Sequence, residues 1–147
     1  MYKNILIPTD GSPLCRSAIQ AGVQLAALSG ARVTGVYAAP AATPLVYRNL
    51  LPVGLATQKQ NADAIKRAGE RHLDVIARAA KAAGVSCDCV SVTSDFPADT
   101  ILAVAKKRKC DLIVMASHSR KGISAMLLGS QTQKVLAQAT IPVLVHR

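Results

Sequence analysis

Small and polar residues follow an apolar run that ends at Met115, and they lead into a helical pattern. Residues 115–122 read Met-Ala-Ser-His-Ser-Arg-Lys-Gly, and Gly129-Ser130 stand directly before that pattern. A strand, such a loop and a Gly-Ser pair at a helix start present backbone N–H groups and the positive end of the helix dipole to a phosphate. Ser130 adds a hydroxyl and is expected to be the N-cap. An ordinary tight strand-to-helix connection has a similar composition, so this loop alone leaves phosphate binding open.

A second polar loop, residues 8–13 (Pro-Thr-Asp-Gly-Ser-Pro), follows the short apolar run 4–7 near the start of the chain. This run is too brief for a helix and predicts a buried strand. Ser12 is expected to cap a helix that starts at Pro13. Asp10 then lies at the carboxyl end of a strand, where open parallel sheets bind ligands. It could accept hydrogen bonds from a ribose or help to hold a cation, or it could be a turn residue that binds nearby backbone.

Strand and helix patterns alternate along the chain and predict an α/β fold with a parallel sheet covered on both faces. The length of 147 residues indicates one domain, 1–147. The expected strands are 3–9, 32–38, 86–93, 111–116 and 143–147, and the expected helices are 13–29, 59–83, 97–107 and 130–139. The proline-containing segment 39–57 is expected to be irregular, as a flap or a contact surface.

The composition is basic and aliphatic. Eighteen Lys and Arg face eight Asp and Glu, which gives a net charge of +10, and the chain has one Phe and no Trp. Basic residues gather at 106–109 and along 59–81, but no aromatic stacking platform or nucleic-acid motif accompanies them. We therefore expect no dedicated nucleic-acid binding, although the positive field favours an anionic nucleotide.

The expected location is the cytoplasm. No apolar run approaches the roughly 18–20 residues of a membrane span, and the first residues do not have the pattern of a signal peptide. Four cysteines, Cys15, Cys87, Cys89 and Cys110, are scattered over the expected elements. Cys87 and Cys89 should point to the same face of one strand, but the spacing is not that of a CxxC motif. The prediction is small buried thiols in a reducing compartment.

These segments together resemble the universal stress protein family from end to end. The resemblance rests on residues 5–12, 111–115, 127–130, 134–136 and 142–145. Nucleotide-binding members of that family carry Gly-x2-Gly-x9-Gly-Ser/Thr, whose positions here are Ala116, Ser119, Gly129 and Ser130. The spacing is intact, and Ala and Ser replace the first two glycines. Glycine in a phosphate loop either supplies positive φ or lets the backbone approach the ligand, so these replacements bear on binding.

The resemblance implies a doubly wound five-stranded parallel sheet in the order 3-2-1-4-5, with an adenine-nucleotide site where strands one and four end. It implies that ATP, with Mg²⁺ between its phosphates, contacts Pro8, Thr9, Asp10, Val36, Met115, Ala116, Ser119, Gly129, Ser130 and Gln131. Plain core packing is the alternative for Val36 and Met115. It also implies a homodimer through the C-terminal strand, 143–145.

The function expected from this reading is an adenine-nucleotide binding or sensing module in a stress response. The chain has no G-x-x-x-x-G-K-[ST] lysine and no residue evidently placed to activate water, so at most slow ATP hydrolysis is expected. A phosphoreceiver domain would need acidic neighbours around Asp10, which the loop does not have. A nucleotide-free dimeric regulatory protein of the same family is the serious alternative.

Overall fold

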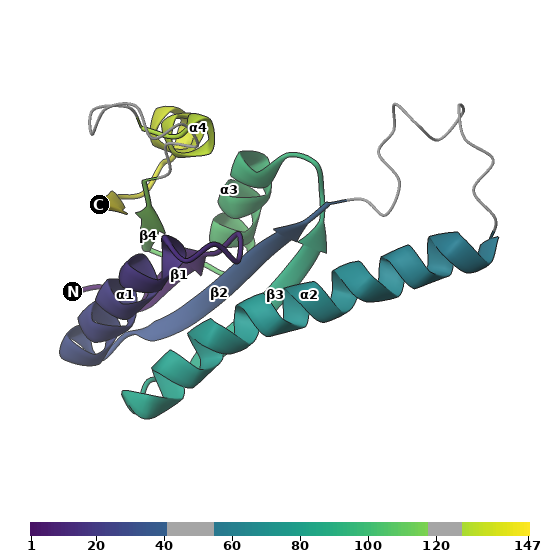
Figure 1. Ribbon diagram of the computed structural model, residues 1–147. Helices are drawn as coiled ribbons and strands as arrows, with labels where there is room; N and C mark the ends of the chain where they lie inside the picture. Colours follow the sequence, from purple (N-terminus) through teal and green to yellow (C-terminus); the bar gives the residue numbers. More distant parts are fainter. Residues whose placement is uncertain (41–54, 118–127) are drawn as a thin grey trace.

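The computed structural model describes residues 1–40, 55–117 and 128–147 and contains one five-stranded sheet (Figure 1). All the strand pairs are parallel, and the order is β3-β2-β1-β4-β5, as predicted. The strands are β1 (Asn4–Pro8), β2 (Arg32–Ala39), β3 (Cys87–Thr93), β4 (Leu112–Ala116) and β5 (Val143–His146). The helices are α1 (Cys15–Ser29), α2 (Leu55–Ala82), α3 (Pro97–Lys107) and α4 (Ser130–Gln138).

Two aliphatic core clusters lie on the two faces of the sheet, which confirms the doubly wound arrangement. On one face, α1 and α2 pack Ile19, Val23 and Ile76 against alternate residues of β1 and β4. On the other face, α3 and α4 pack Ile101 and Val135 against the residues in between. β1 and β4 are buried on both faces, since all ten of their residues are buried. Continuous apolar runs are the sequence pattern that such strands require.

A buried polar group joins three elements at the amino end of the sheet. The carboxylate of Asp111 accepts hydrogen bonds from the backbone N–H groups of Lys3 (2.8 Å) and Asn4 (3.0 Å). The Asn4 side chain donates to the carbonyl of Arg108 (2.9 Å) and accepts from the hydroxyl of Thr34 (2.9 Å). These bonds fix the start of β1 against β4 on one side and β2 on the other.

Two expected helix starts and one expected cap residue were wrong. α1 begins at Cys15 rather than Pro13, because residues 12–14 form a turn, and its N-cap is Leu14 without a side-chain cap bond. The N-cap of α4 is Gly129, so Ser130 is the first helical residue rather than the cap. α2 begins at Leu55, inside the segment expected to be irregular. The rest of that segment, apart from Ala39 and Pro40, lies outside the described residues.

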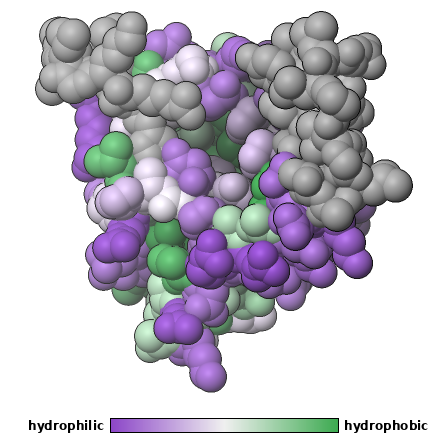
Figure 2. All heavy atoms as spheres, turned by 45° about the vertical axis from the view of Figure 1, so that its right-hand side comes forward, coloured by the Kyte–Doolittle hydropathy of each residue, from purple (hydrophilic) through white to green (hydrophobic). Residues whose placement is uncertain are grey.

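The described surface agrees with the charge pattern. Lys106, Lys107, Arg108 and Lys109 are exposed at the end of α3, where cations complement the helix dipole. The face shown in Figure 2 is mostly hydrophilic, with hydrophobic residues visible only in small areas. Across residues 1–40, 55–117 and 128–147, no helix combines the length and the apolar character needed to cross a bilayer.

Gly22 sets how closely α1 approaches the sheet. A Cβ atom there would lie 2.6 Å from Cδ1 of Ile7 and 3.4 Å from Cβ of Val114. We therefore expect Gly22→Val to lower the free energy of unfolding by about 1–3 kcal/mol, the usual cost of overpacking. Ala27→Val, on the exposed side of the same helix, should change it by only about 0.5 kcal/mol. Urea unfolding measures both, and equal losses would contradict the close approach at Gly22.

Candidate functional site

The loop after β1 is a compact turn at the carboxyl end of the central strand. Thr9 is buried, and its N–H donates to the carbonyl of Val36 (2.9 Å). Its hydroxyl oxygen accepts from the N–H of Gly11 (3.1 Å). Oδ1 of Asp10 accepts from the N–H of Ser12 (2.8 Å), which is the turn geometry typical of aspartate. The loop thereby holds the exposed Asp10 carboxylate at the carboxyl end of β1.

The Cys15 thiol supports that carboxylate from the first turn of α1. Its Sγ lies 3.2 Å from Oδ1 of Asp10, and the side chain is 3% exposed. Burial raises the pKa of the Cys15 thiol, and the charge of Asp10 raises it further. The thiol therefore stays protonated at neutral pH and donates to the carboxylate.

His72, on α2, covers the same loop, and the sequence analysis missed it. Gly11 has a φ of +80°, and a Cβ on it would lie 2.2–2.5 Å from three atoms of the His72 imidazole. The imidazole also meets the Tyr37 ring edge to face, with ring centroids 5.1 Å apart. The position of His72 within an amphipathic helix gives no sequence signal of this contact. Gly11, between two polar turn residues, was compatible with positive φ.

The end of β4 lies at the same edge of the sheet as this loop. β1 and β4 are parallel neighbours, and Leu6 pairs with Ile113, so both strands end on this side of the sheet. Met115 is buried in the core under α3 and α4, whereas the methyl of Ala116 is buried on the face covered by α1 and α2. Ala116 is therefore a core side chain, and only its backbone borders the strand end. The backbone of Val36 likewise borders the site, because its side chain belongs to the core.

The first turn of α4 is attached to the end of β4 and to α3. The hydroxyl of Thr132 donates to the carbonyl of Ala116 (3.3 Å), and Thr132 is 2% exposed. Oε1 of Gln131 accepts from the N–H of Ala98 at the start of α3 (3.1 Å). The Gln131 side chain thus joins two helices in this structure, although it was predicted to approach a phosphate.

Gly129 precedes α4 with φ −59° and ψ 150°, a conformation that any residue adopts. Glycine is therefore not required there for positive φ. The N–H groups of the first helical turn, which starts with Ser130, have no partners within the helix. A small residue at this position lets a ligand approach those donors closely.

The structure brings most of the predicted site residues to one end of the sheet. Pro8, Thr9 and Asp10 end β1, Met115 and Ala116 end β4, and Gly129, Ser130 and Gln131 start α4. Ser119, with the rest of 118–127, lies outside the described residues. The end of β1, next to both β2 and β4, is the topological switch point where doubly wound folds bind ligands.

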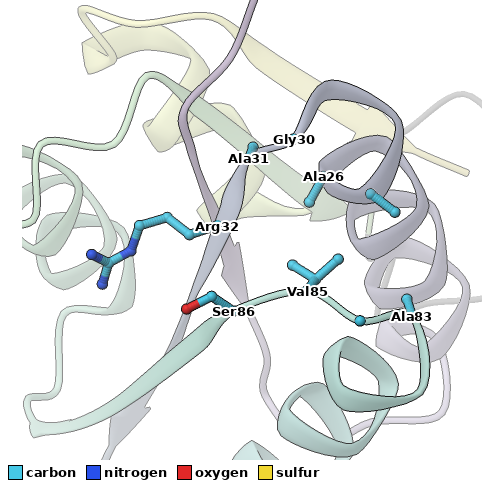
Figure 3. A pocket seen from close by; sticks show the side chains of 9 residues that line it. Ala26, Gly30, Ala31, Arg32, Ala83, Val85 and Ser86 are labelled. Carbon is cyan, nitrogen blue, oxygen red and sulfur yellow. The ribbon is translucent and has the colours of Figure 1, made fainter.

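A separate hollow of about 260 Å³ lies at the opposite, amino end of β2 and β3 (Figure 3). It is lined mainly by Ala, Gly and Val side chains, and in Figure 3 the Arg32 side chain points away from Val85 and Ala26. Arg32 instead pairs with Asp88. Without convergent polar groups, this hollow is a poor candidate for the ligand site.

The fold and the switch-point loops define a doubly wound nucleotide-type domain, and comparisons with known proteins identify the family. The universal stress protein family model matches residues 1–147. A universal stress protein of Thermus aquaticus is 33% identical over all of both chains. A family member from Burkholderia pseudomallei has a solved structure with a TM-score of 0.78 and 25% identity, covering 99% of this chain and 96% of that one. The chain belongs to the universal stress protein family.

Some solved relatives contain adenine nucleotides. One universal stress protein, 25% identical with a TM-score of 0.66, was solved in complex with cAMP, and the similarity covers 99% of this chain and 97% of that one. A family member from Archaeoglobus fulgidus was solved with dAMP, at 19% identity and a TM-score of 0.66, covering 99% and 98% of the two chains. At the latter identity the likeness shows the fold alone.

The contact between Gly11 and His72 yields a test of the loop. Gly11→Ala should lower the free energy of unfolding in two parts, about 1–2 kcal/mol for positive φ and a further part for displacing the imidazole. In a His72→Ala background only the backbone part should remain. Chemical unfolding of the four proteins measures this coupling. Equal costs of Gly11→Ala in both backgrounds would show that His72 does not rest on the loop.

Proposed function

We propose that the crevice at the ends of β1 and β4 binds an adenine nucleotide, and that the protein acts as a nucleotide-binding or sensing module in a stress response in the cytoplasm. The observation that carries this is the start of α4. The hydroxyl of Thr132 binds α4 to the end of β4. α4 begins after Gly129, whose backbone conformation any residue could adopt. The start of α4 and Asp10 both lie at the switch point. The cAMP complex of a relative that is 25% identical supports the choice of adenine.

The donors in the crevice suit an anionic, ribose-containing ligand. Backbone N–H groups at Ser130 and Gln131 and the hydroxyl of Ser130 are groups that bind phosphate oxygens. The Asp10 carboxylate, already fixed by Ser12 and Cys15, is an acceptor suited to ribose hydroxyls. The chain's charge of +10 attracts a polyanion at long range.

We propose ATP with Mg²⁺ as the ligand, with the cation brought by the nucleotide. Among the described residues, no group of three or more His, Cys, Asp or Glu side chains is arranged to hold a metal ion. Mg²⁺ in nucleotide sites keeps several waters and binds mainly phosphate oxygens plus one or two carboxylates. The phosphates of ATP therefore supply most of its ligands, and the proposal assigns no catalytic residue.

Nucleotides released from freshly purified protein can be identified by mass spectrometry, and nucleotide-stripped protein can be tested by thermal shift with millimolar Mg-ATP. We expect ATP, ADP or AMP in the released fraction and a raised melting temperature on adding Mg-ATP. An empty fraction together with an unchanged melting temperature would favour the nucleotide-free regulatory protein instead.

Gly129 offers a graded test of the close approach. Gly129→Ala should weaken Mg-ATP binding, and Gly129→Val should weaken it at least tenfold, or about 1.4 kcal/mol, because the larger side chain blocks access to the N–H groups of α4. Equilibrium dialysis measures the affinities. Melting temperatures without nucleotide should be unchanged, since both residues adopt φ −59°. Wild-type affinity in Gly129→Val would contradict this phosphate position.

We also propose that the protein is a homodimer through β5. Among the described strands, β5 lies at the edge of the sheet and pairs with β4 alone, and its Leu144 is 40% exposed. Leu136 on the neighbouring α4 is 41% exposed. An uncovered apolar edge is an aggregation risk, and two-fold pairing with a second copy satisfies its backbone groups.

Leu144→Lys should shift the dimer toward monomer, because it places a charge within the buried seam. Leu28→Lys is the matched control, since Leu28 is 87% exposed on α1 and should leave association unchanged. Sedimentation velocity at micromolar concentration measures both variants. A wild-type protein that sediments only as a monomer would refute the proposed dimer.

A further inference from the structure

Two thiols lie side by side on β3, which is two strands away from β1 in the strand order. Cys87 and Cys89 occupy alternate positions of β3, whose one partner among the described strands is β2. Their Sγ atoms are 3.8 Å apart. Cys89 is exposed and Cys87 is half-buried, so the pair is accessible from the edge. The prediction that both cysteines share a face is confirmed, whereas the prediction that both are buried was wrong, because an edge strand leaves them partly uncovered.

Residues of α2 and β2 surround the Cys89 sulfur. Sγ of Cys89 lies 3.7 Å from the carbonyl oxygen of Leu73 on α2. It occupies the space beside Gly35 on β2, where an added Cβ would lie only 2.9 Å from this sulfur and 3.2 Å from Cδ1 of Ile76. Any larger residue at position 35 would displace the thiol.

The two thiols are also hydrogen-bonded to each other. This bond lowers the pKa of Cys87, while the same bond, followed by burial, raises the pKa of Cys89. Cys87 is therefore the thiol of the pair that loses its proton more readily. Arg32 at the start of β2 adds a smaller lowering of the Cys87 pKa.

The separation of the sulfurs decides between two uses of such a pair. A disulfide needs sulfurs about 2.05 Å apart and Cα atoms within about 6.8 Å. Alternate residues of an extended strand lie at roughly that upper limit, so a bridge would force β3 to bend. In contrast, two thiolates each about 2.3 Å from a metal ion and 3.8 Å apart subtend about 110° at the metal, which is close to the tetrahedral angle.

We propose that Cys87 and Cys89 form a two-thiolate site for a thiophilic d¹⁰ cation of the Zn²⁺ and Cd²⁺ type. The cation forms one bond to each sulfur, loses two of its waters and releases the proton of each bound thiol into solvent. Within the described parts of the chain, no group of three or more His, Cys, Asp or Glu is arranged to hold a metal ion. In the proposed site, water or a small external thiol occupies the two remaining tetrahedral positions.

Cd²⁺ titration of the reduced protein under anaerobic conditions tests the site directly. Wild type should bind one Cd²⁺ per chain, with a thiolate-to-metal charge-transfer band in the ultraviolet and release of protons to the buffer. Cys87→Ser and Cys89→Ser should each weaken binding at least tenfold and reduce the band. One Cd²⁺ per two chains with the same dependence would also support the pair, with two copies completing the tetrahedron.

Cys15→Ser and Cys110→Ser are the matched controls, because both thiols are buried on other parts of the fold. Both should bind Cd²⁺ as wild type does, and unchanged circular dichroism and melting temperature in all four variants would exclude unfolding as the cause. Binding by Cys87→Ser and Cys89→Ser within threefold of wild type would overturn the proposal. So would loss of binding in either control.

Discussion

The position of β1 depends on the carboxylate of Asp111, which binds the backbone of Lys3 and Asn4 where the central strand begins. Two N–H groups at a strand start would otherwise find partners only in water. The Asn4 side chain also binds the carbonyl of Arg108 and the hydroxyl of Thr34. These bonds hold the starts of β2 and β4 against the start of β1. Since β1 and β4 are parallel neighbours, both strands end at the same edge of the sheet. The two candidate ligand loops therefore share one edge.

Close approach between backbone and side chain recurs at several glycines of the described structure. Gly22 brings α1 onto Ile7, Gly35 makes room for the Cys89 thiol, and Gly11 lies against the imidazole of His72. Gly129 precedes α4 in a backbone conformation that does not require glycine. Since the backbone conformation does not explain a glycine at position 129, we propose that a ligand approaches the start of α4 there. Of the two replaced motif positions, Ala116 lies within the described residues, and its methyl is buried in the core.

Apolar periodicity predicted all five strands and all four helices, because strands buried on both faces and amphipathic helices leave strong patterns in sequence. The strand order came from the family resemblance rather than from the pattern, and the structure confirms it. Helix caps were predicted less well. Ser12 and Ser130 have the right chemistry for caps, but the N-caps are Leu14, two residues after Ser12, and Gly129, one residue before Ser130. The partners of Gln131 and His72 could not be predicted, because they come from elements far apart in sequence and depend on how the helices pack.

The central claim is that the end of β1 and the start of α4 together form one adenine-nucleotide site. Calorimetric titration of nucleotide-stripped protein with Mg-ATP, and in parallel with Mg-GTP, tests it most directly. The account predicts saturable heat with one Mg-ATP per chain and at least tenfold weaker binding of Mg-GTP. No heat with either nucleotide, at concentrations up to the millimolar range, would contradict it.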